Sequence, residues 1–456
     1  MCRVGSINRI AHIYEKVIPS IKDSPLALQA RYPTHGAAVL SKLDLKFQLS
    51  GRFKICSVRT YKKALSVAES FRYDLEGNPD LCNIAIVSTW APRMCGIATF
   101  SAALRDALLE VCPDGSRVDV VVAKHKDHSK WEYNLSEAKF FINEYEPMEY
   151  IDAAQFINKE AYRTVLVQYE FGMLSGDNLV CMLRELKAPN VLTTIHTVHH
   201  GLGENMHSWV QQCAFLSKKL VVMTHSMRHS LAAYHSIPTR DVAVIPHGGP
   251  DVPYERWDGT PLQTLFPGKK VILSNGLLHP MKGIEIMIRA MPQVLAEVPD
   301  AVYLVHGRPH PSGVNCEEYY TAIMEEANAT APNNIFFNRS FALTSDLYDM
   351  LKNTRVYVNA YTDQGQSVSG TLAMALSTGT VAISTPYSYA AEMLRNNTGR
   401  MVPFNDVNAL ADAVIEVLKD DENHKLMSRK AYELAQQQTW KKVANAYLNL
   451  QQPAAS

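Results

Sequence analysis

The stretch that decides how the chain is interpreted is Asn83-Ile-Ala-Ile-Val-Ser-Thr89, followed by the helix-length segment Ala98–Leu109. The first part is a continuous apolar run without polar alternation, which is typical of a strand buried on both faces. Further runs of the same kind follow at helix-length intervals: Val118–Ala123, Thr164–Gln168, Val191–Ile195, Leu220–Met223 and Val242–Ile245. Strands that alternate with helices in this way predict a parallel sheet covered by helices.

A second series of apolar runs follows: Val271–Ser274, Val302–His306, Asn334–Phe337, Val356–Ala360 and Val381–Ser384. Between the two series the Pro-rich stretch Pro250–Pro261 breaks the alternation, which places a domain boundary near 250–268. We therefore predict an α/β protein of two tandem Rossmann-like, doubly wound domains that face an interdomain cleft. The predicted segments are a basic N-terminal extension (1–80), two domains (81–255 and 256–438) and a C-terminal helix crossing back (439–456).

The amino-acid composition argues against several classes of protein. The 45 Lys and Arg balance the 45 Asp and Glu, so bulk charge does not favour nucleic acid as a partner. No apolar run approaches the length of a membrane-spanning helix, so we expect no transmembrane segment. The 8 cysteines are scattered without a C-x-x-C pair. In a chain of this length they predict reduced thiols in a cytoplasmic compartment, not a disulfide framework or a zinc site.

The balanced charge conceals a basic N-terminal segment. Residues 1–65 hold twelve Lys or Arg against three acidic residues, an excess of about +9. The segment lacks the apolar core of a secretory signal. Two interpretations remain open: a basic extension packed on the main body, or an organelle transit peptide.

Three motifs of the first domain lie at predicted strand ends. His196, in Thr193–His200, can bind a substrate hydroxyl or take a proton, although a histidine that merely caps a loop fits equally well. Glu170 could reach the same cleft or only orient a neighbouring group. Gly96, in Arg93–Phe100, would let the backbone at a helix start approach an anion, but a tight turn alone also explains it.

Two motifs of the second domain predict an anion site. In Ser274–Gly283 a strand ends and a helix begins after Gly283, which puts the Lys282 cation beside a helix N-terminus. Ser369-Gly-Thr371 opens an apolar helix, and its backbone N–H groups and hydroxyls suit a phosphate, although Ser369 could serve only as an N-cap. The two motifs together favour phosphate more strongly than either does alone.

The order and spacing of these motifs resemble the retaining GT-B glycosyltransferases of family 4, the glycosyl transferases group 1, over roughly residues 83–450. Val244-Ile-Pro-His-Gly248, Ser384-Thr-Pro386 with Glu392, and Arg400–Phe404 add to the resemblance. It implies an acceptor-side first domain and a donor-side second domain. It also implies transfer of a sugar from an activated donor to an acceptor hydroxyl, with retained anomeric configuration and no metal or other cofactor.

The resemblance further implies roles for single residues. Lys282 would neutralise the departing phosphate, and the backbone amides of Ser369, Gly370 and Thr371 would hold it. His196 would contact the donor sugar, with Glu170 beside it as a third catalytic candidate. Gly276 belongs to the donor turn, and Gly96 would let its loop close over the leaving group or the acceptor.

The sequence departs from the family pattern at three positions. Leu277 replaces the arginine that normally shares the diphosphate, and Gln366 and Met374 replace a pair of glutamates, the second of which binds the ribose. Arg308 or Arg339, each near a predicted strand end, could substitute, or both could be ordinary loop arginines.

These departures keep the nature of the donor open. A nucleotide sugar is the first expectation. The resemblance of Ser369-Gly-Thr371 to the phosphate site of glycogen-type phosphorylases supports a sugar 1-phosphate or inorganic phosphate instead. A third possibility is a catalytically silent module that binds a glycan or another partner.

Overall fold

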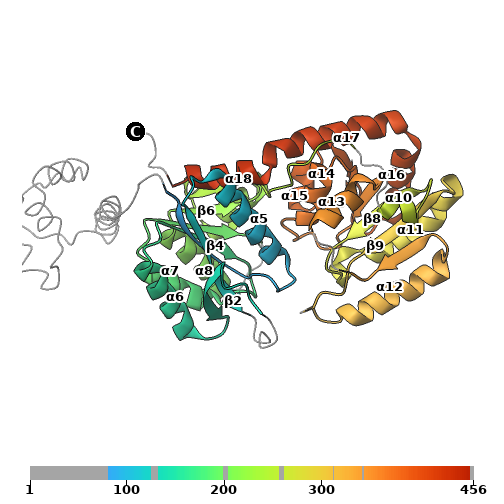
Figure 1. The fold of residues 1–456 in the computed structure, drawn as a ribbon. Coiled ribbons are helices and arrows are strands. Elements are labelled where there is room, and N and C mark those ends of the chain that lie inside the picture. Colours follow the sequence, from blue (N-terminus) through green and yellow to red (C-terminus); the bar gives the residue numbers. More distant parts are fainter. Residues whose placement is uncertain are drawn as a thin grey trace, which may run out of the picture. The chain divides into compact units, whose positions relative to one another are not determined.

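The computed structural model describes residues 81–124, 132–198, 204–255, 261–311, 313–340 and 344–451 (Figure 1). The predicted N-terminal extension (1–80) lies outside the described residues. Both interpretations of its positive charge therefore stay predictions. Leu81–Leu186 and Asn190–Ser456 belong to one compact unit, which contains two parallel sheets.

The first sheet has seven strands in the order β3-β2-β1-β4-β5-β6-β7. They are β1 (Asn83–Ser88), β2 (Arg117–Lys124), β3 (Ala138–Asn143), β4 (Thr164–Tyr169), β5 (Asn190–Ile195), β6 (Lys219–Val222) and β7 (Val242–Val244). The intervening helices are α5 (Gly96–Val111), α6 (Pro147–Lys159), α7 (Gly176–Glu185), α8 (Glu204–Leu216), α9 (His225–His235) and the 3₁₀ turn η2 (Thr239–Asp241). The strand order reverses between β1 and β4, which is where ligands bind in doubly wound sheets.

The second sheet has six strands in the order β10-β9-β8-β11-β12-β13 and so repeats the same winding. They are β8 (Lys270–Asn275), β9 (Ala301–His306), β10 (Ile335–Asn338), β11 (Val356–Asn359), β12 (Ala382–Ser384) and β13 (Gly399–Met401). Its helices are α10 (Pro261–Leu265), η3 (Pro280–Lys282), α11 (Ile284–Glu297), α12 (Cys316–Thr330), α13 (Thr344–Lys352), α14 (Gly370–Ser377), α15 (Ser388–Met393), α16 (Val407–Lys419) and α17 (Asp421–Ala435). The predicted fold of two Rossmann-like sheets is confirmed.

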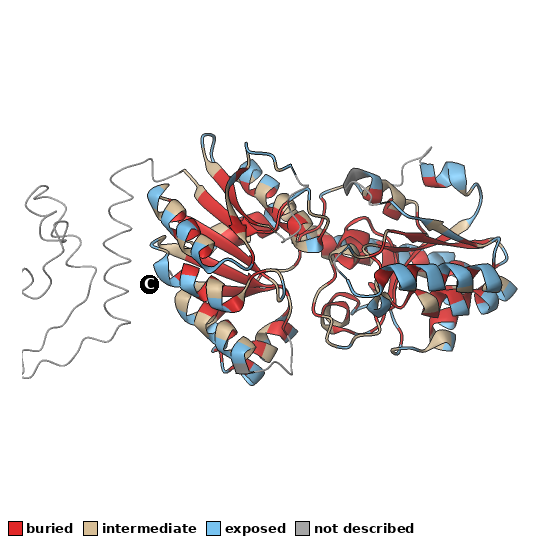
Figure 2. Ribbon diagram, turned by 90° about the horizontal axis from the view of Figure 1, so that it is seen from below, coloured by how far each residue is buried: buried red, intermediate tan, exposed pale blue. Residues whose placement is uncertain are grey.

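Alternate residues of the central strands of the second sheet pack into two different cores, one on each face of the sheet. Ile272 of β8 packs into the core that contains Met287, whereas its neighbour Leu273 packs into the core that contains Leu372. A strand that is covered on both faces needs apolar residues at every position. These segments are therefore continuous apolar runs in the sequence. Figure 2 shows the strands as buried and the outer helix faces as exposed.

Two stretches of chain connect the sheets, and they are hydrogen-bonded to each other. Gly249, after β7, donates its N–H to the carbonyl of Gln438, at the end of η4 (Gln436–Gln438). The N–H of Trp440 in turn donates to the carbonyl of Gly249. Helix α18 (Trp440–Asn449) then packs on α5, and Tyr447 and Thr194 of β5 hydrogen-bond through their hydroxyls at 2.8 Å.

The structure contains a disulfide that the sequence analysis did not predict. Cys82 and Cys112 form a disulfide with their Cα atoms 6.0 Å apart. Cys82 precedes β1 and Cys112 caps the C-terminal end of α5, and the return of the chain along the sheet brings them together despite a separation of 30 residues. Scattered spacing therefore concealed the pair. The expectation that all eight cysteines are reduced thiols is wrong for these two.

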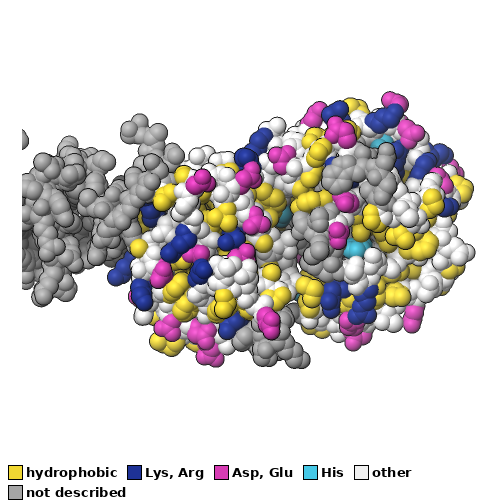
Figure 3. Space-filling model, viewed as in Figure 1, with side chains coloured by type: hydrophobic (Ala, Val, Ile, Leu, Met, Phe, Trp, Pro, Cys, Tyr) yellow, Lys and Arg dark blue, Asp and Glu magenta, His cyan; other side chains and the backbone are white. Residues whose placement is uncertain are grey.

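The described surface carries charges of both signs. Figure 3 shows Lys and Arg side chains interspersed with Asp and Glu on the face that it presents. None of the described helices is both long and apolar enough to cross a bilayer. The last strand of the first sheet ends at Val244, and the first strand of the second begins at Lys270.

Candidate functional site

Lys282 lies beside the first residues of α14. The strand β8 ends at Asn275 and turns at Gly276, whose φ of +130° is accessible to glycine but strained for other residues. A Cβ atom on Gly276 would lie 3.4 Å from the Lys282 Nζ and 3.7 Å from the Cγ2 of Thr371. The turn, the ammonium group and the start of α14 therefore converge on one point.

The Lys282 side chain is held in place by an aromatic neighbour. Its Nζ donates a hydrogen bond to the hydroxyl of Tyr361 at 2.6 Å and lies 4.5 Å from the centroid of that ring. The pKa of the nearby His279 is lowered to about 3. Burial is the main cause, and the positive charge of Lys282 adds to it. The site is therefore electropositive through Lys282 itself and keeps its histidine neighbour neutral.

The start of α14 is organised by hydroxyl groups. The Oγ of Ser369, the N-cap, accepts from the N–H of Leu372 at 3.3 Å, so this serine caps the helix whether or not its backbone also holds a phosphate. Asn359 donates to the same oxygen, and Tyr357 donates to the Oγ1 of Thr371 at 2.7 Å. These contacts fix both side chains, while the first amides of the helix keep the orientation that suits an anion.

A group of rings lies next to this helix start. A Cβ on Gly370 would come within 2.9 Å of the His247 Nε2, so the imidazole rests directly on this glycine. The ring of Phe100, from α5, contacts His247 edge-on at 5.2 Å and His196 at 4.9 Å between centroids. Trp440 packs against Phe100 and His247 at 5.0 and 5.4 Å. His196 is thus connected to the Lys282 and α14 site through the Phe100 and His247 rings.

Both histidines are neutral near pH 7. Burial, and to a lesser extent the neighbouring His247, lower the pKa of His196 to about 3. Burial lowers the pKa of His247 to about 4, partly offset by its hydrogen bond to the carbonyl of Gly248. Two buried imidazoles beside an electropositive site cannot both be charged, so they act as polar neutral groups.

Glu170 stands at the end of β4 and does not bond His196. One of its carboxylate oxygens accepts from the hydroxyl of Thr197 at 2.7 Å, and the other accepts from the N–H of Phe171 at 2.9 Å. Burial raises its pKa to about 7, against the opposing effect of these two hydrogen bonds. A carboxyl group that titrates near neutrality can exchange a proton with a substrate hydroxyl.

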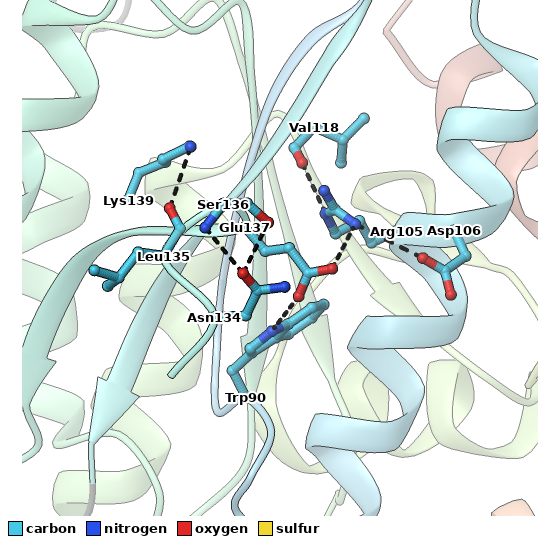
Figure 4. A network of polar contacts seen from close by, with 9 residues as sticks. All are labelled: Trp90, Arg105, Asp106, Val118, Asn134, Leu135, Ser136, Glu137 and Lys139. Carbon is cyan, nitrogen blue, oxygen red and sulfur yellow. Dashed lines mark hydrogen bonds and ion pairs between the residues drawn. The ribbon is translucent and has the colours of Figure 1, made fainter. Parts of the chain in front are cut away.

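The loop between β1 and α5 is fixed by a polar network (Figure 4). Glu137 accepts hydrogen bonds from the indole N–H of Trp90 at 3.2 Å and from Arg105 at 3.3 Å. Arg93 forms an almost fully buried ion pair with Glu144. Gly96 opens α5 in an exposed position, and a Cβ there would meet nothing within 4 Å. The space beside Gly96 is therefore open, on a loop that these polar contacts hold to the neighbouring elements.

The two candidate arginines have different environments. Arg308 follows β9, contacts Met94 of the β1–α5 loop at 3.7 Å through Nη1, and has a buried Nε without a hydrogen-bond partner. Arg339 instead pairs with both carboxylate oxygens of Glu317 at 2.7 Å, and half of its side chain is exposed. The structure therefore brings Arg308 to the Gly96 loop and gives Arg339 the contacts of a surface arginine.

Neither position of the missing glutamate pair carries a carboxylate. The Gln366 amide donates to the carbonyl of Val368 in its own loop at 2.6 Å, and Met374 packs into an apolar core. The same loop contacts the first sheet, because the N–H of Val198 donates to the Ser367 hydroxyl at 3.1 Å. Gln366 therefore bonds within its own loop, and Ser367 connects the loop to the end of β5.

A cavity of about 540 Å³ lies elsewhere, between α9 and α15. His225, His229 and Tyr234 line it from α9, and Glu392 and Arg395 line it from the other side. The Glu392 carboxylate accepts from the N–H groups of His225 and Ser226, so it caps the start of α9. None of the predicted site residues lines this cavity.

Sequence reasoning missed the ring group of Phe100, His247 and Trp440, as well as Tyr361. These residues come from four distant segments, and no spacing in the sequence connects them. The signal that was available is Pro246-His-Gly-Gly249, because two adjacent glycines after a strand indicate close packing. A Cβ on Gly248 would indeed collide with the Trp440 ring.

Part of the chain matches a known protein family. Residues 261–434 match the family described as "Glycosyl transferases group 1". A phosphatidyl-myo-inositol mannosyltransferase of Mycolicibacterium smegmatis is 26% identical over 185 residues, which cover 40% of this chain and 44% of that protein. The match thus spans less than half of the length of this curated relative.

Solved structures show the same fold at low identity. A glycosyltransferase from Rickettsia africae superposes with a TM-score of 0.65 at 16% identity, covering 82% of this chain and 98% of that chain. Anabaena HepE, solved in complex with UDP, superposes with a TM-score of 0.63 at 12% identity, covering 80% and 98% of the two chains. HepE was also solved in complex with UDP-glucose.

Proposed function

With residues 261–434 belonging to the glycosyl transferases group 1 and both sheets arranged as in the GT-B fold, we propose that the chain transfers a sugar from a nucleotide-activated donor to an acceptor hydroxyl. The observation that carries this proposal is the convergence of Lys282, Gly276 and Thr371 on one point at the start of α14. An ammonium group and a helix N-terminus together favour a phosphate that gains negative charge as the sugar leaves.

Each side of the site has a part in the proposed reaction. Lys282, oriented by Tyr361, neutralises the departing phosphate, and the first amides of α14 donate hydrogen bonds to it. His196 and the ring group contact the sugar, and Gly96 leaves room for the acceptor or the leaving group. Arg308, near the Gly96 loop, takes over the diphosphate contact that Leu277 cannot make.

Retention of configuration and independence from metal are parts of this proposal. The positive charge that the leaving phosphate needs is supplied by Lys282 and the helix dipole, so the mechanism requires no metal. Glu170, the carboxylate with a raised pKa, bonds Thr197 and Phe171 and is proposed to act as a proton acceptor for the acceptor hydroxyl.

A turnover panel tests the proposal. Purified protein is incubated with UDP- and GDP-sugars, with and without EDTA, and release of the nucleoside diphosphate is measured. We expect turnover that survives EDTA and that falls at least about a hundredfold in Lys282→Ala, since removing one preorganised charge costs about 3 kcal/mol. Lys419→Ala is the matched control, because Lys419 forms an exposed pair with Glu297.

A phosphorylase-like reaction is the second candidate. It is favoured by the environments of Gln366 and Met374, which offer no free carboxylate to a ribose. Release of sugar 1-phosphate from a glycoside and inorganic phosphate, without turnover of nucleotide sugars, would establish it. Absence of binding to every donor would instead support a silent binding module.

A further inference from the structure

The hydroxyl of Ser369 has both of its lone pairs occupied. The backbone N–H of Leu372 and the side-chain amide of Asn359 donate to the Ser369 Oγ at 3.3 and 3.0 Å. A serine hydroxyl has two acceptor positions and one hydrogen. The same oxygen lies 3.1 Å from the Oγ1 of Thr371. Because its acceptor positions are filled, Ser369 is the donor in its contact with Thr371.

The hydroxyl of Thr371 receives two hydrogen bonds in the same way. It accepts one from Ser369 and one from the hydroxyl of Tyr357, which lies at 2.7 Å. Burial raises the pKa of Tyr357, so its phenol keeps the hydrogen that it donates. The acceptor positions of Thr371 are therefore filled, and its own hydrogen is left over. Among the described residues, no acceptor takes that hydrogen.

The Thr371 side chain borders the proposed phosphate site. It is partly exposed, whereas Ser369 and Tyr357 behind it are buried. A Cβ on Gly276 would lie 3.7 Å from the Thr371 Cγ2 and 3.4 Å from the Lys282 Nζ, so the side chain and the ammonium group flank the same point. A phosphate oxygen bound at that point is an acceptor for the hydrogen that Thr371 has left over.

We propose that Thr371 is a catalytic residue whose hydroxyl donates a hydrogen bond to the departing phosphate, and that Tyr357 and Ser369 are positioning residues that fix the direction of this bond. The proposal rests on the proposed function and adds a side-chain donor to the backbone amides of α14. A hydroxyl that is oriented before the substrate binds needs no reorganisation when the phosphate gains charge. The bond therefore strengthens as the sugar leaves, and it stabilises the transition state more than the intact donor.

A double-mutant cycle on nucleotide binding tests the proposal. The Kd of UDP or GDP, whichever the wild type binds more tightly, is measured by isothermal titration calorimetry. Thr371→Val should raise the Kd at least about tenfold, because a hydrogen bond to a charged group is lost, whereas Thr371→Ser keeps the hydroxyl and should stay within about threefold. Tyr357→Phe should raise the Kd at least about threefold alone but leave the Kd of Thr371→Val unchanged, because Tyr357 acts only through Thr371.

Tyr303→Phe is the matched control for Tyr357→Phe. Tyr303 is also a buried tyrosine, and its hydroxyl donates to the Oγ of Ser274 at 2.9 Å. Tyr303 packs into the core on the other face of the sheet from Tyr357. The loss of its hydroxyl should therefore leave the Kd of the nucleotide unchanged.

The outcomes separate this proposal from the proposed function. A wild-type Kd in Thr371→Val, or equal weakening by Tyr357→Phe in both backgrounds, overturns the Thr371 donor and leaves glycosyl transfer in place. Absence of UDP and GDP binding to the wild type overturns both. Initial rates give a second readout: Thr371→Val should lower kcat by a larger factor than it raises KM. A rise in KM alone would show a bond made equally to the intact donor and would also overturn the proposal.

Discussion

The substitution Gly370→Ala tests how tightly His247 packs against the start of α14. Gly370 is the first residue of α14, and its φ is not in the left-handed region. By helix propensity alone, alanine would therefore stabilise the protein by up to about 1 kcal/mol. The surroundings oppose this gain, because the added Cβ would lie 2.9 Å from the Nε2 and 3.3 Å from the Cε1 of His247.

His247 has no direction in which to withdraw. Phe100 and Trp440 pack against its ring, and its Nδ1 is bonded to the Gly248 carbonyl. Overpacking at such a site costs about 1–3 kcal/mol, which exceeds the gain in helix propensity. We expect Gly370→Ala to lower the free energy of unfolding by about 1–2 kcal/mol in urea denaturation, with the m-value unchanged.

Two further variants give this prediction its controls. Gly96→Ala, at the corresponding first position of α5, meets nothing within 4 Å and should unfold at the same urea concentration as the wild type or a higher one. In a double-mutant cycle, His247→Ala should relieve most of the cost of Gly370→Ala, because it removes the ring that clashes. If Gly370→Ala is as stable as the wild type, the close contact between His247 and α14 is refuted.

The remaining predictions concern Ser369 with Thr371, Glu170 and the disulfide. The double variant Ser369→Ala/Thr371→Val should lower turnover strongly while the protein stays folded by circular dichroism; wild-type rates would show that α14 does not hold the phosphate. Because the pKa of Glu170 is raised to about 7 in the folded state, the unfolded chain loses this proton first, and the group's contribution to stability declines as the pH rises from about 4.5 to 7. Glu170→Gln should therefore gain stability relative to the wild type over this range in thermal melts, and a pH-independent difference would contradict the shift. Dithiothreitol should lower the melting temperature through loss of the Cys82–Cys112 disulfide, worth about 2–4 kcal/mol, whereas Cys82→Ser/Cys112→Ser should melt alike with and without the reductant.

The sequence predicts those parts of the fold that depend on burial on both faces. The strands β1, β4, β5, β8 and β9 are continuous apolar runs because helices cover them on both sides. The edge strand β3 was missed, because Lys139 is exposed and interrupts the apolar run. The short strand β13 was missed as a strand, because its three residues carry too little pattern.

The candidate site was predictable only where one segment carries the signal. Lys282 and Ser369-Gly-Thr371 each stand after a strand of the same parallel sheet, and topology alone brings such ends together. The ring group was not predictable, since Phe100, His247 and Trp440 meet only through α5, the first connection and the start of α18. Arg339 looked equivalent to Arg308 in sequence, and only the partner Glu317 distinguishes it.

Lys282 and the start of α14 are proposed to bind the departing phosphate of an activated sugar. A crystal structure with UDP and the donor sugar tests this binding site. We expect a phosphate oxygen within hydrogen-bond distance of the Lys282 Nζ and of the backbone N–H groups at Gly370 and Thr371. A diphosphate bound away from these groups, with Lys282 still bonded only to Tyr361, would contradict it.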